Sequence, residues 1–176
     1  LANECRAKNL LVKQTIAVHV TGYDGFADLV VCFEVLEHVD DPLSFVSHLR
    51  RMARPGGYIF ISTLSIDGFD LQILGEQSYQ ISPPHHINFL SVRGFQKLFK
   101  RAGLLDTEIS TPGQLDVELV QNAAKSSPAL LDNQAFIRTI LESESKSKAF
   151  QIFLSNNQLS SHAWVLGRNP EINANR

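Results

Sequence analysis

The chain has 176 residues, of which 44% are hydrophobic and 19% are charged, and its net charge is −2. This length fits one domain with a substantial core, and the near-neutral charge gives no electrostatic reason to expect nucleic acid or an anionic membrane as a partner. No apolar run approaches the roughly 20 residues that span a bilayer, and the first residues lack the layout of a signal peptide. Cys5 and Cys32 show no metal-type spacing, which favours free thiols in a reducing cytoplasm.

The first third of the chain predicts two strands. Residues 2–9 indicate a short helix, and a strand follows at 10–17, within "NLLVKQTIA" (9–17). "FADLVVCF" (26–33) is a short, nearly continuous apolar run, which is typical of a parallel strand buried on both faces of its sheet. We therefore expect a buried strand at 26–33.

The next segment predicts a helix followed by another strand. Asp41 has the character of an N-cap, Pro42 suits the first helical position, and one helical face is apolar at Leu43, Val46, Leu49 and Met52. "RPGG" (54–57) ends this helix, and "YIFIST" (58–63) is rich in β-branched and aromatic residues. Strand, helix and strand together form a βαβ unit, which predicts a right-handed crossover and a parallel sheet.

The rest of the chain alternates in the same way and predicts an α/β fold. In chain order we expect a loop at 64–84, a helix at 91–103 that stops at Gly103, a strand at 104–111, mainly helical structure at 114–158 with breaks near 126–128 and 143–148, and a last strand at 161–170.

Two stretches of the chain carry a family resemblance. "ADLVVCFEVLEHVDDPLSFVSHLRRMARPGGYIFIST" strongly resembles the centre of class I S-adenosylmethionine-dependent methyltransferases, in which the fourth strand ends in an "EVLEHV-DP" turn and "RPGG" leads into the fifth. "SPPHHINFLSVRGFQKLFKRAG" resembles the family's next segment, a "HxxxFS" loop and a helix that ends in "AGF". The resemblance covers roughly residues 1–111 and the last strand.

The resemblance implies both a fold and an activity. It implies a Rossmann-like methyltransferase sheet, mostly parallel with an antiparallel last strand, in a single domain of residues 1–176. The core would be 1–112 and 159–170, with a helical insertion at 113–158. The activity would be methyl transfer from S-adenosylmethionine to a small-molecule acceptor by in-line displacement, which depends mainly on positioning.

One departure from the family pattern concerns the donor. Such enzymes hold the cofactor with a glycine-rich loop after the first strand and an acidic residue that ends the second. This chain contains no GxG, and its start resembles the helix after the second strand. We therefore expect an N-terminally incomplete sheet whose strand at 26–33 has an apolar open edge. We predict that a second copy, another chain or the N-terminal segment covers this edge, because bare edges promote aggregation.

Glu34, Glu37 and His38 follow the strand that ends at Phe33 and form the first candidate site. At helical spacing the three side chains share one face, where oxygen and imidazole donors suit a divalent cation. The stretch is similar to ubiquinone-pathway O-methyltransferases, whose matching Glu, Glu and His are associated with Mg²⁺. The alternatives are that these residues line or orient the pocket, that His38 is a general base, or that they merely brace the following helix and loop.

The second candidate site is the loop "YQISPPHHINF" (79–89). His85 and His86 follow a strand of the predicted sheet, where ligand sites of α/β proteins lie, so we expect them on the acceptor side as catalytic residues beside His38. The alternative is that one of them braces the loop and the other is solvated. Cys32, Phe33 and Glu34 stand where the family's backbone meets the cofactor, so the resemblance assigns them to cofactor binding.

Two competing functions remain. A non-catalytic methyltransferase-like fragment or scaffold that binds a protein partner is favoured by the absent glycine loop. A Rossmann-like dehydrogenase would need a dinucleotide fingerprint, which is also absent.

Asp116 and Glu118 have the placement of charges at the start of a helix.

Overall fold

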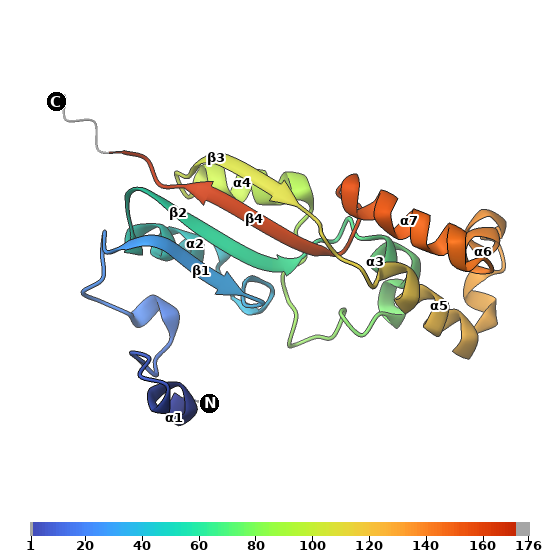
Figure 1. Cartoon of the computed structure of the whole chain (residues 1–176), viewed down its shortest axis with the longest axis horizontal. Helices are drawn as coiled ribbons and strands as arrows, with labels where there is room; N and C mark the ends of the chain where they lie inside the picture. Colours follow the sequence, from blue (N-terminus) through green and yellow to red (C-terminus); the bar gives the residue numbers. More distant parts are fainter. Residues whose placement is uncertain (1, 172–176) are drawn as a thin grey trace.

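The computed structural model describes residues 2–171, which fold around one four-stranded sheet (Figure 1). The strands are β1 (Ala27–Phe33), β2 (Ala53–Leu64), β3 (Leu105–Ser110) and β4 (His162–Arg168). They lie in the order β1-β2-β4-β3; β1 is parallel to β2, and β4 is antiparallel to both of its neighbours. Three strands therefore run one way and the last runs against them, as predicted.

Two amphipathic helices cover one face of the sheet. These are α2 (Pro42–Met52) and α4 (Val92–Arg101), which lie behind the sheet in Figure 1. Inward-facing residues of the strands and helices form the main core, in which Ile59, Ile61, Val165 and Phe99 are fully buried. Burying such side chains stabilises a fold by about 1.5–3 kcal/mol each.

Four further helices pack at the other end of the molecule around a second apolar cluster. They are α3 (Phe69–Leu74), α5 (Asp116–Ser126), α6 (Ala135–Leu141) and α7 (Glu144–Asn156), with the short turns η3 (Gly75–Gln77) and η4 (Pro128–Leu131) between them. The cluster is built on Phe69, Leu74, Val117, Val120, Leu131 and Leu154. Thus α3, which precedes the predicted insertion of residues 113–158, packs with it.

Local signals in the sequence placed several element ends correctly. The Asp41 carboxylate accepts a hydrogen bond from the Ser44 N–H at 3.0 Å, and Pro42 opens α2, as predicted. Gly103 follows α4 with φ +80, a left-handed conformation that suits glycine after a helix. The βαβ unit of β1, α2 and β2 is likewise confirmed.

Three expectations about elements were wrong. Residues 10–16 form no strand: they connect α1 (Ala2–Ala7) to the turn η1 (Ala17–His19), and Leu11 is 83% exposed. A strand needs a neighbour for its N–H and C=O groups, and no described strand lies beside this segment. The loop at 64–84 contains α3 and η3, and β2 begins at Ala53, before the RPGG turn.

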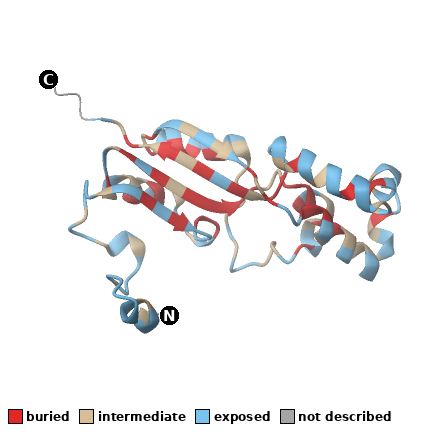
Figure 2. Ribbon diagram, in the orientation of Figure 1, coloured by how far each residue is buried: buried red, intermediate tan, exposed pale blue. Residues whose placement is uncertain are grey.

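The strand predicted to be buried on both faces is buried on one. Val30 and Cys32 of β1 face the main core, whereas Leu29, Val31 and Phe33 are 52%, 49% and 61% exposed. Figure 2 shows these exposed positions alternating with buried ones, and no described helix covers this face.

The outer edge of β1 pairs with no other described strand, because β1 is the end strand of the sheet. Cover by the N-terminal segment is therefore not found, and cover by a second copy or another chain stays a prediction. No helix in the described part of the chain combines the length and apolarity needed to cross a membrane.

Candidate active site

The parallel strands β1 and β2 end at the same edge of the sheet, beside a cleft of about 620 Å³. It is lined by the turn after β1, the end of β2, the loop at 80–86, residues 112–119 around the start of α5, and residues 160–162 at the start of β4. Ligands of open α/β sheets bind at the carboxyl ends of the strands, so this cleft is the candidate site.

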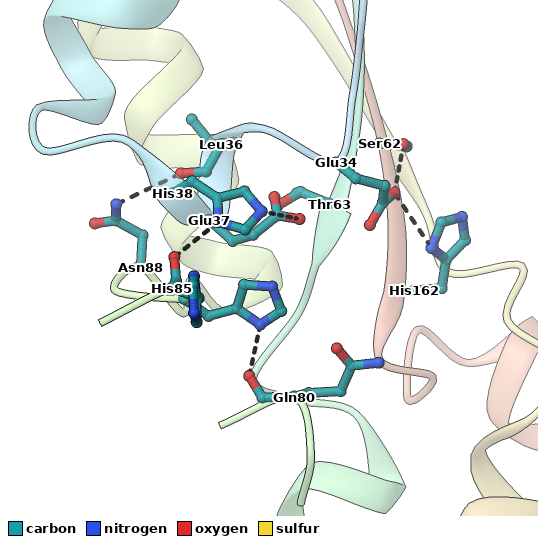
Figure 3. A network of polar contacts seen from close by, with 11 residues as sticks. Glu34, Leu36, Glu37, His38, Ser62, Thr63, Gln80, His85, Asn88 and His162 are labelled. Carbon is teal, nitrogen blue, oxygen red and sulfur yellow. Dashed lines mark hydrogen bonds and ion pairs between the residues drawn. The ribbon is translucent and has the colours of Figure 1, made fainter. Parts of the chain in front are cut away.

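Glu34 leaves β1 in a left-handed conformation, with φ +50, which is uncommon for a residue other than glycine. Its Oε1 accepts a hydrogen bond from the Ser62 hydroxyl at 2.6 Å and lies 3.7 Å from His162 Nδ1. Figure 3 shows this carboxylate turned toward β2 and β4, away from Glu37. The unusual backbone therefore directs Glu34 to the β4 side of the cleft.

Glu37 lies in the turn η2 (Leu36–His38) and is 2% exposed. Its Oε2 accepts a hydrogen bond from the Thr63 hydroxyl at 2.8 Å, and its backbone carbonyl accepts from the N–H groups of Ile87 and Asn88. This one residue joins the end of β1, the end of β2 and the histidine loop.

His38 and His86 present their rings to the cleft in matching ways. His38 Nδ1 bonds the His85 carbonyl at 2.7 Å, and His86 Nδ1 bonds the Gln80 carbonyl at 2.6 Å. Because a carbonyl only accepts, both Nδ1 atoms carry the proton, and each neutral ring keeps a lone pair on Nε2. The rings are 4.7 Å apart, so two proton acceptors stand side by side.

The structure brings together a different set of possible metal ligands from the predicted one. One donor atom each from Glu37, His38 and His86 lies within 4.8 Å of the others, and Glu34 is not part of this cluster. The predicted set Glu34, Glu37 and His38 is therefore not assembled as a whole. Mg²⁺ prefers oxygen ligands, and one carboxylate with two imidazoles does not fit that preference.

The other predicted site residues, His85, Cys32 and Phe33, lie outside this cluster of possible metal ligands. The exposed His85 contributes its carbonyl to His38, while its ring is not among the groups that line the cleft. Cys32 is buried in the core, and burial, reinforced by Glu37 and Glu34, raises the pKa of its thiol to about 11. Phe33 is exposed on the open face, with its ring 5.9 Å from that of Phe60. Cys32 can therefore meet a ligand only through its backbone.

Asp116 is a cleft residue that sequence reasoning missed. It is 2% exposed and accepts hydrogen bonds from the Ser160 hydroxyl, the Ser161 N–H and the Gln151 amide at 2.6–2.7 Å. Burial alone would raise the pKa of this carboxyl, but these donors hold it below its ordinary value. Gly113 makes room for the contact, since a Cβ there would lie 1.9 Å from Ser160 Oγ.

Asp70 of α3 lies behind Asp116 and is fully buried. Its carboxyl oxygens have no well-aligned hydrogen-bond partner in the described chain. Burial raises the pKa of Asp70 to about 6, and the neighbouring Asp116 adds to the rise. The two carboxyls therefore differ in protonation between about pH 4 and pH 6, where Asp116 is ionised and Asp70 is still protonated.

Comparisons with known proteins agree with this architecture. Residues 2–109 match the sequence profile of a family described as "Methyltransferase domain". A ubiquinone biosynthesis O-methyltransferase of Vibrio parahaemolyticus is 32% identical over 115 residues, which cover 62% of this chain and 49% of that protein. The chain spans half or less of the curated relatives it matches; for the Pectobacterium atrosepticum enzyme, 41% identical over 54 residues, the share is 22%.

Solved structures share the fold. S-adenosylmethionine-dependent methyltransferases of Thermotoga maritima and Archaeoglobus fulgidus each align with a TM-score of 0.59, at 13% and 18% identity. The alignments cover 96% and 94% of this chain and 68% and 70% of those chains. The predicted Rossmann-like methyltransferase fold is therefore confirmed.

Asp70 predicts a pH dependence of stability. Its folded pKa lies above the ordinary aspartate value of about 3.9, so its contribution to stability is full below about pH 4 and is lost as the pH rises through 6. We expect Asp70→Asn to unfold at a higher urea concentration than the parent protein at pH 7, because its free energy of unfolding is larger by up to about 3 kcal/mol. Near pH 4 the two proteins should have the same free energy of unfolding. Asp24→Asn, at an exposed site, is the control; equal effects of both variants at pH 7 would contradict the assignment.

Proposed function

The chain belongs to the family of methyltransferase domains, and we propose that it transfers a methyl group from S-adenosylmethionine to a small-molecule acceptor. The observation that carries the proposal is the cleft at the carboxyl ends of β1 and β2, where the Nε2 atoms of His38 and His86 are free to accept a proton. A small acceptor is favoured over nucleic acid, because no Lys or Arg is among the described lining residues.

The end of β1 is the proposed cofactor side. There Cys32 would contribute its backbone, Phe33 an exposed aromatic surface and Glu34 a half-exposed carboxylate, a set that fits a ligand with both polar and apolar parts. When bound, S-adenosylmethionine supplies an electrophilic methyl group on a sulfonium.

The histidines form the proposed acceptor side. His38 would take the proton that an acceptor hydroxyl or amine loses, and its Nδ1 bond to the His85 carbonyl fixes the ring orientation for that role. His86 holds a second free Nε2 beside it. His85 supports the site through its carbonyl; its predicted catalytic role has no support from the position of its ring.

A second candidate function is binding of another polypeptide along β1. The support is the unpaired outer edge of β1 together with three exposed apolar side chains, Leu29, Val31 and Phe33, on the uncovered face. A second copy could extend the sheet by pairing edge to edge, and a non-catalytic scaffold could use the same surface. The free thiols of Cys5 and Cys32 favour the cytoplasm as the location of this protein, whichever of the two functions it has.

Calorimetric titration with S-adenosylmethionine and S-adenosylhomocysteine tests the first function. We expect micromolar binding of both ligands, about tenfold weaker binding in Glu34→Ala, and unchanged binding in His86→Ala, because His86 belongs to the acceptor side. No heat of binding at millimolar ligand would contradict the enzymatic proposal and favour the scaffold.

Sedimentation analysis tests pairing of two copies at β1. We expect a concentration-dependent dimer, and we expect Val31→Lys to raise its dissociation constant at least about tenfold, since a charge on an edge strand opposes sheet extension. Ile152→Lys, at an exposed site on α7, is the matched control. A monomer at all concentrations, or equal loss in both variants, would rule out this interface.

A further inference from the structure

The carboxylates of the cleft have no Lys or Arg beside them in the described chain. Glu34, Glu37 and Asp116 line the cleft, and no described lining residue is Lys or Arg. No described Lys or Arg forms an ion pair with any of these three carboxylates; the ion pairs of the described cations lie elsewhere, for example between Arg54 and Asp28. The described walls of the cleft are therefore acidic, and their basic neighbours are imidazoles, with His38 Nε2 3.8 Å from Glu37 and His162 Nδ1 3.7 Å from Glu34, rather than Lys or Arg.

Asp116 shows how a buried carboxylate of the cleft keeps its negative charge. Its partners are a hydroxyl, a backbone N–H and a side-chain amide, all of which are neutral. Neutral donors stabilise a carboxylate but leave its charge in place, and buried charges are ordinarily paired with an opposite one. The buried Asp116 is a fixed negative charge with which a cationic ligand can form an ion pair.

Glu37 is a second buried carboxylate in the lining of the cleft. It is 2% exposed, its Oε2 is bonded by the Thr63 hydroxyl, and its Oε1 lies 3.8 Å from His38 Nε2. Because His38 Nδ1 bonds the His85 carbonyl, a neutral His38 ring has no proton on Nε2, and Oε1 is then open to a ligand.

Between the acidic walls the cleft has an apolar surface. Leu64, Pro112, Leu115 and Leu119 line it together with the histidine rings. A ligand that fills this space needs a small apolar body, and its polar end meets acceptors of hydrogen bonds rather than cations.

We propose that the cleft selects acceptors in which a protonated amine is attached to a small apolar body, and that it discriminates against carboxylates and phosphates. This inference rests on the proposed function, since it specifies the acceptor of that same site. The amine would lie between Glu37 and Asp116, where its charge balances theirs. A carboxylate or phosphate placed there would meet like charge, with no Lys or Arg among the described lining residues to pair with it.

The test compares three probes of equal size in the absence of S-adenosylmethionine: benzylamine, benzyl alcohol and benzoate. Binding is followed at pH 7 by NMR titration of the protein amides. We expect benzylamine to bind at least about tenfold more tightly than benzoate, with benzyl alcohol between them, and we expect added salt to reduce the difference. Equal binding, tighter binding of benzoate, or binding of none of the probes at millimolar concentration would overturn the proposal.

Two isosteric variants locate the charge, and one variant serves as the control. Glu37→Gln and Asp116→Asn should each weaken benzylamine binding at least about fivefold and leave benzyl alcohol unchanged. Glu118→Gln, on α5 but outside the cleft, should change neither. Equal losses for amine and alcohol would point to misfolding; the comparison of probes on the parent protein then decides the proposal alone.

Binding of the methyl donor, S-adenosylmethionine, is measured in a separate titration. If Asp116→Asn weakens S-adenosylmethionine binding and spares benzylamine, the carboxylate serves the sulfonium and the proposal about the acceptor is wrong. Conversely, selective binding of benzylamine without any binding of S-adenosylmethionine would leave this inference intact and remove the proposed methyl transfer.

Discussion

The parallel pairing of β1 with β2 is the constraint on which the rest of the site depends. In this register Phe33 lies beside Ser62, so the residues that follow β1 meet the last residues of β2. Glu34 is thereby placed against Ser62 and Glu37 against Thr63. Through its carbonyl, Glu37 then fixes the histidine loop at 87–88. A shift of one residue would turn these side chains to the opposite faces and separate the carboxylates from their donors.

The two faces of the sheet have different physical roles. The face against α2 and α4 buries the main core, and the open face presents apolar side chains of β1 and β2, such as Val31 and Tyr58. Exposed apolar surface of this kind beside an unpaired strand edge is an interaction site in soluble proteins or a hazard of aggregation. The cleft lies at the carboxyl ends of β1 and β2, whereas the second candidate function depends on the open face.

Sequence reasoning succeeded where the signal was local. The cap of Asp41, the stop at Gly103 and the βαβ unit each depend on a few neighbouring residues, and all three were predicted. The strand expected at 10–17 depended on a neighbour that the described chain does not supply. Asp116 was missed because its burial is created by Ser160 and Ser161, some 45 residues away, and nothing in "LDVEL" indicates that contact. His86 was expected on the acceptor side and does line the cleft, but its bond to the Gln80 carbonyl could not be read from its sequence neighbours.

The central claim is that the carboxyl ends of β1 and β2 form the binding cleft for the methyl donor and its acceptor. Mapping amide chemical shifts while S-adenosylhomocysteine is added tests it most directly. The account predicts that the changes concentrate at residues 32–38 and 62–64 and that α7 remains unaffected. Changes confined to α5 and α7, or no changes in any part of the chain, would contradict it.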